Sequence, residues 1–289
     1  MVDEGAGHPS SAIGPAVRRC RHGLMMFLRN DNHIGRSLDL YGEYSPLEVE
    51  LFAQLVRPGD WVVDAGANIG ALTVPLAGMV GPEGLVLAFE PQRPLFHMLC
   101  GNLALNGIEH VIARCAAVGA REGTIGVPKL DYRLTDNFGA LALLEGGGTP
   151  TPLRTIDGLQ LDRLRLLKID VEGAELEVLR GASQTIARLR PILYVENDRR
   201  DKSSALIAAL EAMGYRLWWH PAPLFRPDNF RGDPVDVFGK IMSMNMIGLP
   251  PDATLTGTRL PAVSGPADWG YDRFGFAADM TVFVRSPPG

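Results

Sequence analysis

Short runs of apolar residues alternate with segments of helical spacing over most of the chain. The runs typical of buried strands cover residues 61–63, 85–89, 111–118, 164–171 and 191–196. In the segments between them leucines recur every three or four residues, as at Leu95, Leu99 and Leu103, and this spacing indicates helices. Because strands that alternate with helices build βαβ units, we predict an α/β fold with a mostly parallel sheet covered on both faces.

The two ends of this pattern also carry structural signals. A helix is predicted from Ser45 to Arg57, because Ser45 is a good cap and Pro46 suits the first helical position. Two late apolar runs, residues 215–219 and 281–284, have no helical pattern clearly placed between them. They predict an antiparallel edge of the sheet.

Three parts of the chain depart from the alternation. Residues 1–39 are predicted to be an N-terminal extension, and residues 40–289 a single domain. Within that domain, residues 221–278 are rich in proline, glycine and asparagine and are too long for a simple connection, so we predict an acceptor-binding insertion. A pair of strands is expected at residues 124–127 and 140–144.

Composition is that of an ordinary globular protein. Hydrophobic residues make 46% of the chain and charged residues 21%, which excludes disorder for its bulk. The net charge of −5 disfavours a nucleic acid partner. The three cysteines lack zinc-ligand spacing, so we predict no metal site and expect a reducing cytoplasm. The longest uncharged stretch, residues 65–82, holds four glycines and two prolines, so no membrane span is predicted; a homo-oligomer stays open.

The most informative stretch is VVDAGANIG from Val62, a strand that ends in an acid and enters a glycine turn. Ligands of open α/β sheets bind outside the carboxyl ends of the strands, where this turn lies. Gly66 and Gly70 let the backbone approach a ligand without a Cβ clash. Glu90 ends the next strand, twenty residues beyond Gly70, where a carboxylate accepts both hydroxyls of a ribose.

Glu90 fits either of two cofactors, because a dinucleotide and S-adenosylmethionine both carry adenosine. Asp64 favours S-adenosylmethionine, since a carboxylate at the first turn repels a pyrophosphate and attracts an ammonium and a sulfonium. The glycine spacing is GxxxG, not the GxGxxG of the dinucleotide fingerprint. An NAD-dependent oxidoreductase and a non-catalytic cofactor-binding module stay open as alternatives.

Several further segments occur in the order of a known family. They are GEYS from Gly42, AFEPQ from Ala88, NFG from Asn137, KIDVEGAELEVLRGA from Lys168 and PILYVEN from Pro191. With the glycine turn, they resemble the FkbM family of S-adenosylmethionine-dependent methyltransferases over about residues 30–250. The resemblance implies a Rossmann-like, seven-stranded class I methyltransferase fold and methyl transfer to a hydroxyl oxygen of a sugar or natural product. Within the enzymes, N-methylation of a small metabolite is the alternative.

The resemblance also implies a set of cofactor contacts. Asp64, Gly66 and Asn68 line the methionine end of the cofactor. Glu90 holds the ribose, and Asp170 faces the transferred methyl group. The third strand ends in RCAAV, which has no acid for the adenine amine, so backbone and apolar contacts are expected to hold the adenine. Gly70 and Ala117 complete the predicted cofactor-binding residues.

A hydroxyl acceptor needs a base that removes its proton. The predicted catalytic residues at strand ends are Asp170, Glu172 and His220, and Glu196 is a further candidate for the base. His220 directly precedes the predicted insertion and titrates near neutrality. The residues expected to contact the acceptor are Asn137, Glu196, Asn229 and Asn245.

Overall fold

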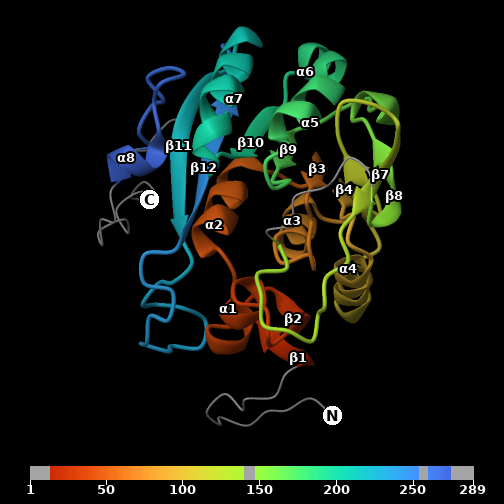
Figure 1. Ribbon diagram of the computed structural model, residues 1–289, viewed down its shortest axis with the longest axis vertical. Coiled ribbons are helices and arrows are strands. Elements are labelled where there is room, and N and C mark those ends of the chain that lie inside the picture. Colours follow the sequence, from red (N-terminus) through yellow and green to blue (C-terminus); the bar gives the residue numbers. More distant parts are fainter. Residues whose placement is uncertain (1–13, 140–146, 254–259, 275–289) are drawn as a thin grey trace.

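A seven-stranded sheet forms the centre of the fold (Figure 1). The computed structural model describes residues 14–139, 147–253 and 260–274. The strands lie in the order β5 (Val111–Arg114), β4 (Leu85–Phe89), β3 (Trp61–Ala65), β9 (Leu166–Ile169), β10 (Ile192–Glu196), β12 (Met242–Leu249) and β11 (Arg216–Pro223). The first five are parallel, and β12 is antiparallel to both of its neighbours. This order confirms the predicted α/β fold with a mostly parallel sheet and an antiparallel edge.

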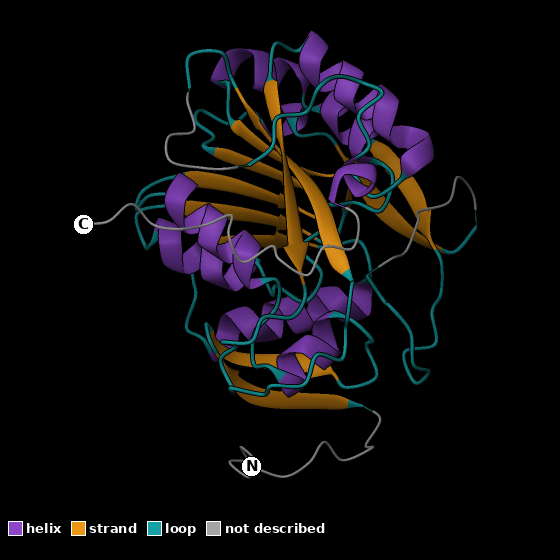
Figure 2. Ribbon diagram, turned by 90° about the vertical axis from the view of Figure 1, so that its left-hand side faces the viewer, coloured by secondary structure: helices purple, strands orange, loops and turns teal. Residues whose placement is uncertain are grey.

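Helices cover both faces of the sheet, as Figure 2 shows. One face carries α2 (Pro46–Leu55), α3 (Thr73–Val80) and α4 (Arg93–Leu105), and the other carries α5 (Glu175–Gly181), α6 (Ser183–Leu189) and α7 (Arg200–Ala212). Side chains of a strand alternate between the faces, so the neighbours Val62 and Val63 belong to opposite core clusters. Both are fully buried, which explains why the strands are continuous apolar runs in the sequence.

Residues 15–40 fold against the main sheet's helices. They make a hairpin of β1 (Pro15–Cys20) and β2 (Gly23–Leu28) followed by α1 (Ile34–Leu40). Phe27 of the hairpin shares a core cluster with Ile69 of the glycine turn. The buried Asn102 of α4 joins the two: its Oδ1 accepts from the amide of Met26, and its Nδ2 donates to the carbonyl of Ile69. The hairpin therefore supports the turn that follows β3.

The antiparallel edge differs from the sequence prediction in one strand. Its second member is β12, which lies inside the segment 221–278 that we predicted as an insertion. The connection between β11 and β12 is thus only residues 224–241. The apolar pattern did not predict β12, because its sequence, MSMNMIGL, contains serine, asparagine and glycine, which are typical of loops. The predicted strand 281–284 lies outside the described residues.

A small second sheet stands beside the main one. It consists of β6 (Ala117–Val118), β8 (Thr149–Arg154) and β7 (Gly123–Val127). The apolar run 111–118 therefore divides between two sheets. The strand expected at 124–127 is present as β7, whereas residues 140–144 lie outside the described part. Two short elements, η1 (Asp157–Leu159) and α8 (Gly270–Phe274), complete the described structure. Among its helices, none has the length and apolar character that a membrane crossing needs.

Candidate active site

A cavity of about 390 Å³ opens at the carboxyl ends of the parallel strands. Beside it lies a narrow slot of about 40 Å³, which shares Gly66, Glu90 and Asp170 with the cavity wall. The cofactor half is the wall formed by Gly66, Ala67, Asn68, Ala71, Leu72, Glu90, Asn137 and Gly139. The acceptor half is the wall formed by His33, Ile34, Tyr44, Lys168, Asp170, Glu172, Glu196, Asp198, Arg199, Leu224, residues 241–243 and Tyr271.

The turn after β3 requires glycine at its first tight position. Gly66 has φ +86°, and a Cβ added there would lie 1.7 Å from the carbonyl oxygen of Asp170. The turn therefore packs directly against the end of β9. Its next polar residue, Asn68, also has positive φ and lines the cavity.

Glu90 is held in place by the same turn. Its carboxylate accepts one hydrogen bond from the amide of Asn68, at 2.9 Å, and another from the amide of Gln92, at 2.7 Å. The side chain is 3% exposed, and burial raises the pKa of Glu90 to about 7 although the two amides lower it. Each carboxylate oxygen has a second lone pair for a ligand hydroxyl. The predicted ribose position is thus oriented by backbone amides.

The slot next to Glu90 has an apolar side formed by Phe89, Ala116, Ala117 and Val118. Its polar residues are Glu90, Gln92, Asp170 and Glu172. Gln92 is fixed by two hydrogen bonds, since its Nε2 donates to the carbonyl of Phe138 and its Oε1 accepts from Tyr132. The apolar side of this slot suits a flat heteroaromatic ring.

Asp64 is not in the described wall of the cavity, which corrects its predicted contact with the cofactor. It is fully buried, with Oδ1 3.0 Å from Nζ of Lys168 and Oδ2 accepting from Thr73. Lys168 also lies 3.2 Å from Oδ2 of Asp170 and donates to the carbonyl of Gly66. Asp64 therefore anchors a lysine that joins the glycine turn to Asp170.

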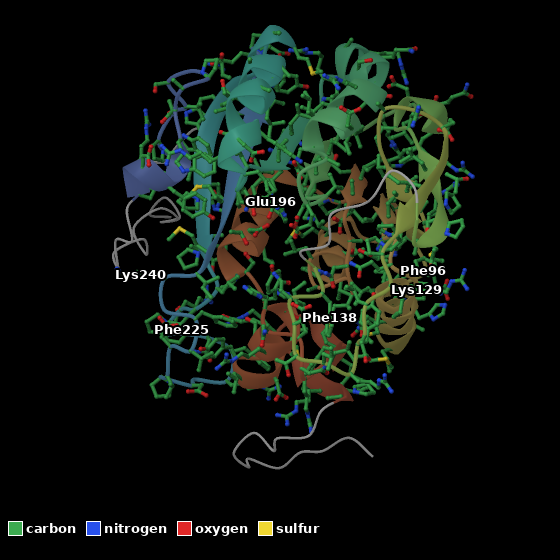
Figure 3. All side chains as sticks on the ribbon, in the orientation of Figure 1. Phe96, Lys129, Phe138, Glu196, Phe225 and Lys240 are labelled. Carbon is green, nitrogen blue, oxygen red and sulfur yellow. The ribbon has the colours of Figure 1, made fainter. Side chains whose placement is uncertain are left out.

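Three carboxylates meet in the acceptor half. One oxygen from each of Asp170, Glu172 and Glu196 lies within 4.8 Å of the others, and we call these residues the acid cluster. Burial and the charge of Asp170 raise the pKa of Glu172 to about 8, although Arg199 donates to it at 2.8 Å. The same two causes raise the pKa of Glu196 well above its usual value. Glu196, labelled in Figure 3, ends β10 and is half-buried in the cavity wall.

His220 does not reach the cavity among the described residues, so it is not the base that we predicted. It is 1% exposed, and its Nδ1 lies 2.7 Å from the hydroxyl of Tyr194. Burial lowers the pKa of His220 to about 4. The prediction was wrong because β11 continues to Pro223, so His220 lies within the strand and not at its end.

Of the remaining predicted contacts, Asn137 lines the cavity, whereas Gly70, Asn229 and Asn245 lie outside its described wall. Gly70 is required by packing, because a Cβ there would lie 2.7 Å from Leu99. Asn229 stabilises its own loop, because its Nδ2 donates hydrogen bonds to the carbonyls of Arg226 and Asp233. Asn245 is buried in β12, directly opposite Glu196.

Sequence reasoning gave no role to most residues of the acceptor half, among them His33, Tyr44, Lys168 and Arg199. Lys168 gave a usable signal: a lysine within the buried apolar run LLKI needs a partner charge. Tyr44 stands in the GEYS segment but was given no role. Burial and nearby carboxylates, first Glu48, raise the pKa of Tyr44 well above its usual value. The sequence around His33 and Arg199 has no feature that distinguishes these two residues from ordinary surface residues.

The family model described as "Methyltransferase FkbM domain" matches residues 64–217, which include the glycine turn, Glu90 and the acid cluster. The chain belongs to the FkbM methyltransferase family. The cofactor of this FkbM protein is therefore S-adenosylmethionine.

Two fungal proteins are similar to this FkbM protein over part of their length. "Methyltransferase sdnD" of Sordaria araneosa is 31% identical over 158 residues, which cover 43% of this chain and 61% of that protein. "Methyltransferase 1" of Beauveria bassiana is 29% identical over 144 residues, covering 42% of this chain and 57% of that protein. This chain thus matches only about three fifths of each relative.

A solved structure described as methyltransferase FkbM from Methylobacillus flagellatus is also similar. It is 17% identical with a TM-score of 0.44, and the match covers 69% of this chain and 50% of that one. The fold assignment of this FkbM protein rests on its own sheet order, which is that of a class I methyltransferase.

S-adenosylmethionine fits the residues that form the cavity and the slot of this FkbM protein. Glu90 would hold the ribose, because its buried carboxylate is already oriented by the amides of Asn68 and Gln92. Ala117 and its neighbours would enclose the adenine. Asp170 reaches both the slot and the cavity, and its negative charge suits the cationic end of the cofactor.

Proposed function

We propose that this FkbM protein methylates a hydroxyl oxygen of a small polyhydroxylated molecule, such as a sugar or a natural product. The observation that carries the proposal is Glu196, a carboxyl with a raised pKa that faces the cavity beside Asp170. A carboxylate whose pKa is raised binds a proton more strongly than an ordinary one. The bound cofactor supplies an electrophilic methyl group, and the chain must supply positioning and a proton acceptor.

The residues divide this work between the two halves of the cavity. In the cofactor half, Glu90 and the glycine turn orient the ribose end of the ligand. In the acceptor half, Glu196 accepts the proton of the acceptor hydroxyl, and Asp170 is held at the boundary by Lys168. A cavity of about 390 Å³ suits a small molecule rather than a nucleic acid strand. The three free cysteines suit work in a reducing compartment such as the cytoplasm.

The acid cluster also favours a second candidate, N-methylation. An acid-rich wall attracts a cationic amine, which becomes a nucleophile after it loses one proton. The neutral form of an amine needs little help from a base. Removal of the base therefore discriminates the two reactions.

The experiment is transfer of labelled methyl groups from S-adenosylmethionine to panels of polyols and of amines. For the acceptor that is methylated, Glu196→Gln should lower turnover by about 10²–10⁴-fold if the accepting atom is oxygen. Its affinity for the cofactor should stay within about threefold of wild type, because Glu196 is outside the slot. Glu177→Gln, on the exposed side of α5 and paired with Arg180, is the matched control.

Four results would contradict the proposal. Unchanged turnover in Glu196→Gln would remove this residue from the reaction, and methylation of amines alone would favour N-methylation. Binding of the cofactor without transfer to any acceptor would indicate a non-catalytic module. Binding of NAD but not of S-adenosylmethionine would indicate an oxidoreductase.

A further inference from the structure

A second cavity, of about 440 Å³, lies outside the active site. Three segments form most of its wall: the start of α4 with the residues before it, the residues that follow β7, and β8. Phe96 of α4 and Lys129, which follows β7, belong to this wall and are labelled in Figure 3. The second cavity shares Pro91 and Gln92 with the slot and no described residue with the larger active-site cavity. It is therefore a separate space, and its volume suits a small organic molecule.

One side of the second cavity is apolar and held by contacts from behind. Phe96, Leu130 and Tyr132 line it, and all three are half-buried and pack against a buried core cluster. The ring centroid of Tyr132 lies 4.9 Å from that of Phe138, and the hydroxyl of Tyr132 donates to Oε1 of Gln92 at 2.8 Å. Because these side chains are already fixed, they lose little conformational freedom when a ligand packs on them.

The polar side of the second cavity carries positive charge. Arg93 and His97 lie one turn apart on α4, and Lys129 lies in the segment after β7. Neither Arg93 nor Lys129 has an ion-pair partner in the part of the chain that the structure describes. The described residues of the wall include no aspartate and no glutamate. Two unpaired cations beside apolar walls therefore produce a local positive potential.

This potential is opposite in sign to that of the active site. The chain has a net charge of −5, and the acceptor half carries the acid cluster. An anion is thus repelled by the acceptor half and attracted by Arg93 and Lys129. The apolar side adjacent to these cations favours an anion that also has an aromatic body.

We propose that the second cavity binds a small organic anion, whose aromatic ring packs against Phe96 and Tyr132 and whose carboxylate, sulfonate or phosphate group lies beside Arg93 and Lys129. A guanidinium pairs with such a group through two parallel hydrogen bonds, and an ammonium adds a point charge. Gln92, which the second cavity shares with the slot, donates its backbone amide to Glu90. The bound anion therefore lies next to the cofactor half and not next to the acceptor.

The test is fluorescence titration of the full chain with 8-anilinonaphthalene-1-sulfonate, an aromatic anion that becomes fluorescent when it leaves water. We expect saturable binding at one site per chain. The double variant Arg93→Gln/Lys129→Gln should bind this anion about tenfold more weakly, because both charged partners are lost. Arg57→Gln removes an exposed arginine that follows α2, and it should bind the anion as wild type does.

A neutral probe separates loss of charge from loss of the cavity. N-phenyl-1-naphthylamine has the same aromatic body without the sulfonate, so wild type and the double variant should bind it within about threefold of each other. Thermal unfolding of each variant shows that the fold is kept. S-adenosylhomocysteine should leave the anion bound, because the described walls of the slot and the second cavity share only Pro91 and Gln92.

Four outcomes would overturn this anion site. They are the absence of saturable binding of the anion, equal affinity of wild type and the double variant for it, an equal loss of both probes in the double variant, and complete displacement of the anion by S-adenosylhomocysteine. The last would mean that the probe occupies the slot. Because binding is measured without an acceptor and without turnover, the result does not depend on the methyl transfer proposed above.

Discussion

The two halves of the cavity are built in different ways. The cofactor half takes its central residues, Gly66, Asn68 and Glu90, from 25 consecutive positions and orients them through backbone amides. The acceptor half gathers side chains from separate parts of the chain, from His33 to Tyr271. Backbone geometry therefore defines the first half, and the grouping of charged side chains defines the second.

This difference determines how each half responds to substitution. In the cofactor half a single added carbon atom collides with backbone, which cannot move cheaply. In the acceptor half a carboxylate can be replaced by an amide of nearly the same shape, so the charge changes and the packing stays. Steric changes should thus disable the first half, and charge changes the second.

The largest effect on binding is expected from Gly66→Ala. The added Cβ would lie 1.7 Å from the carbonyl of Asp170, at a φ that disfavours alanine. We expect cofactor affinity to fall by more than about 100-fold, as calorimetric titration would show. Gly78→Ala is the control: its Cβ meets nothing within 4 Å in α3, so alanine should raise helix stability by about 1 kcal/mol. Equal affinity in Gly66→Ala and wild type would show that the turn does not contact the cofactor.

A smaller effect on binding is expected from Glu90→Gln. Loss of a charged acceptor costs about 1.5–3 kcal/mol, or roughly 10–100-fold in affinity. In the wild-type chain the pKa of Glu90 is about 7, and only the ionised form accepts from both ribose hydroxyls. Affinity should therefore fall by up to about tenfold per unit as the pH drops below 7, and stay constant above it. Titrations at several pH values check this, and Glu90→Gln should abolish the dependence. Were the variant to keep the wild-type pH profile, another group would be responsible.

The smallest effect on turnover is expected from His220→Gln. Because His220 is buried behind the acceptor half, turnover should change by less than about threefold. Stability should fall by about 1–3 kcal/mol in urea unfolding, since the variant disturbs the hydrogen bond to Tyr194. A turnover loss of 100-fold with intact cofactor affinity would instead restore His220 as the base.

The cofactor half could be predicted from the sequence because its signals are local. The turn of Gly66, the position of Glu90 at the cavity and the position of Ala117 in the slot all follow from the strand ends and their spacing. The position of Asp64 near the end of β3 was predicted correctly, but its ion pair with Lys168 was not predicted. Its contact with Lys168 depends on the register of two strands a hundred residues apart, which no local pattern contains.

The acceptor half could be predicted only as separate residues. Asp170, Glu172 and Glu196 were each chosen because they end strands, and the structure brings them within 4.8 Å of one another. His220 and Asn245 were misplaced because β11 and β12 extend beyond their apolar runs. The fold was more predictable than this half of the site, since alternating apolar runs define a parallel sheet but not which polar side chains meet at its edge.

The most direct test of this division of labour is calorimetric titration of Glu90→Gln and Glu196→Gln with S-adenosylmethionine, side by side with the wild-type chain. Glu90→Gln should bind about 10–100-fold more weakly than wild type, and Glu196→Gln should bind within about threefold of it. The opposite result, a weakened Glu196→Gln and an unaffected Glu90→Gln, would contradict the assignment of the two halves.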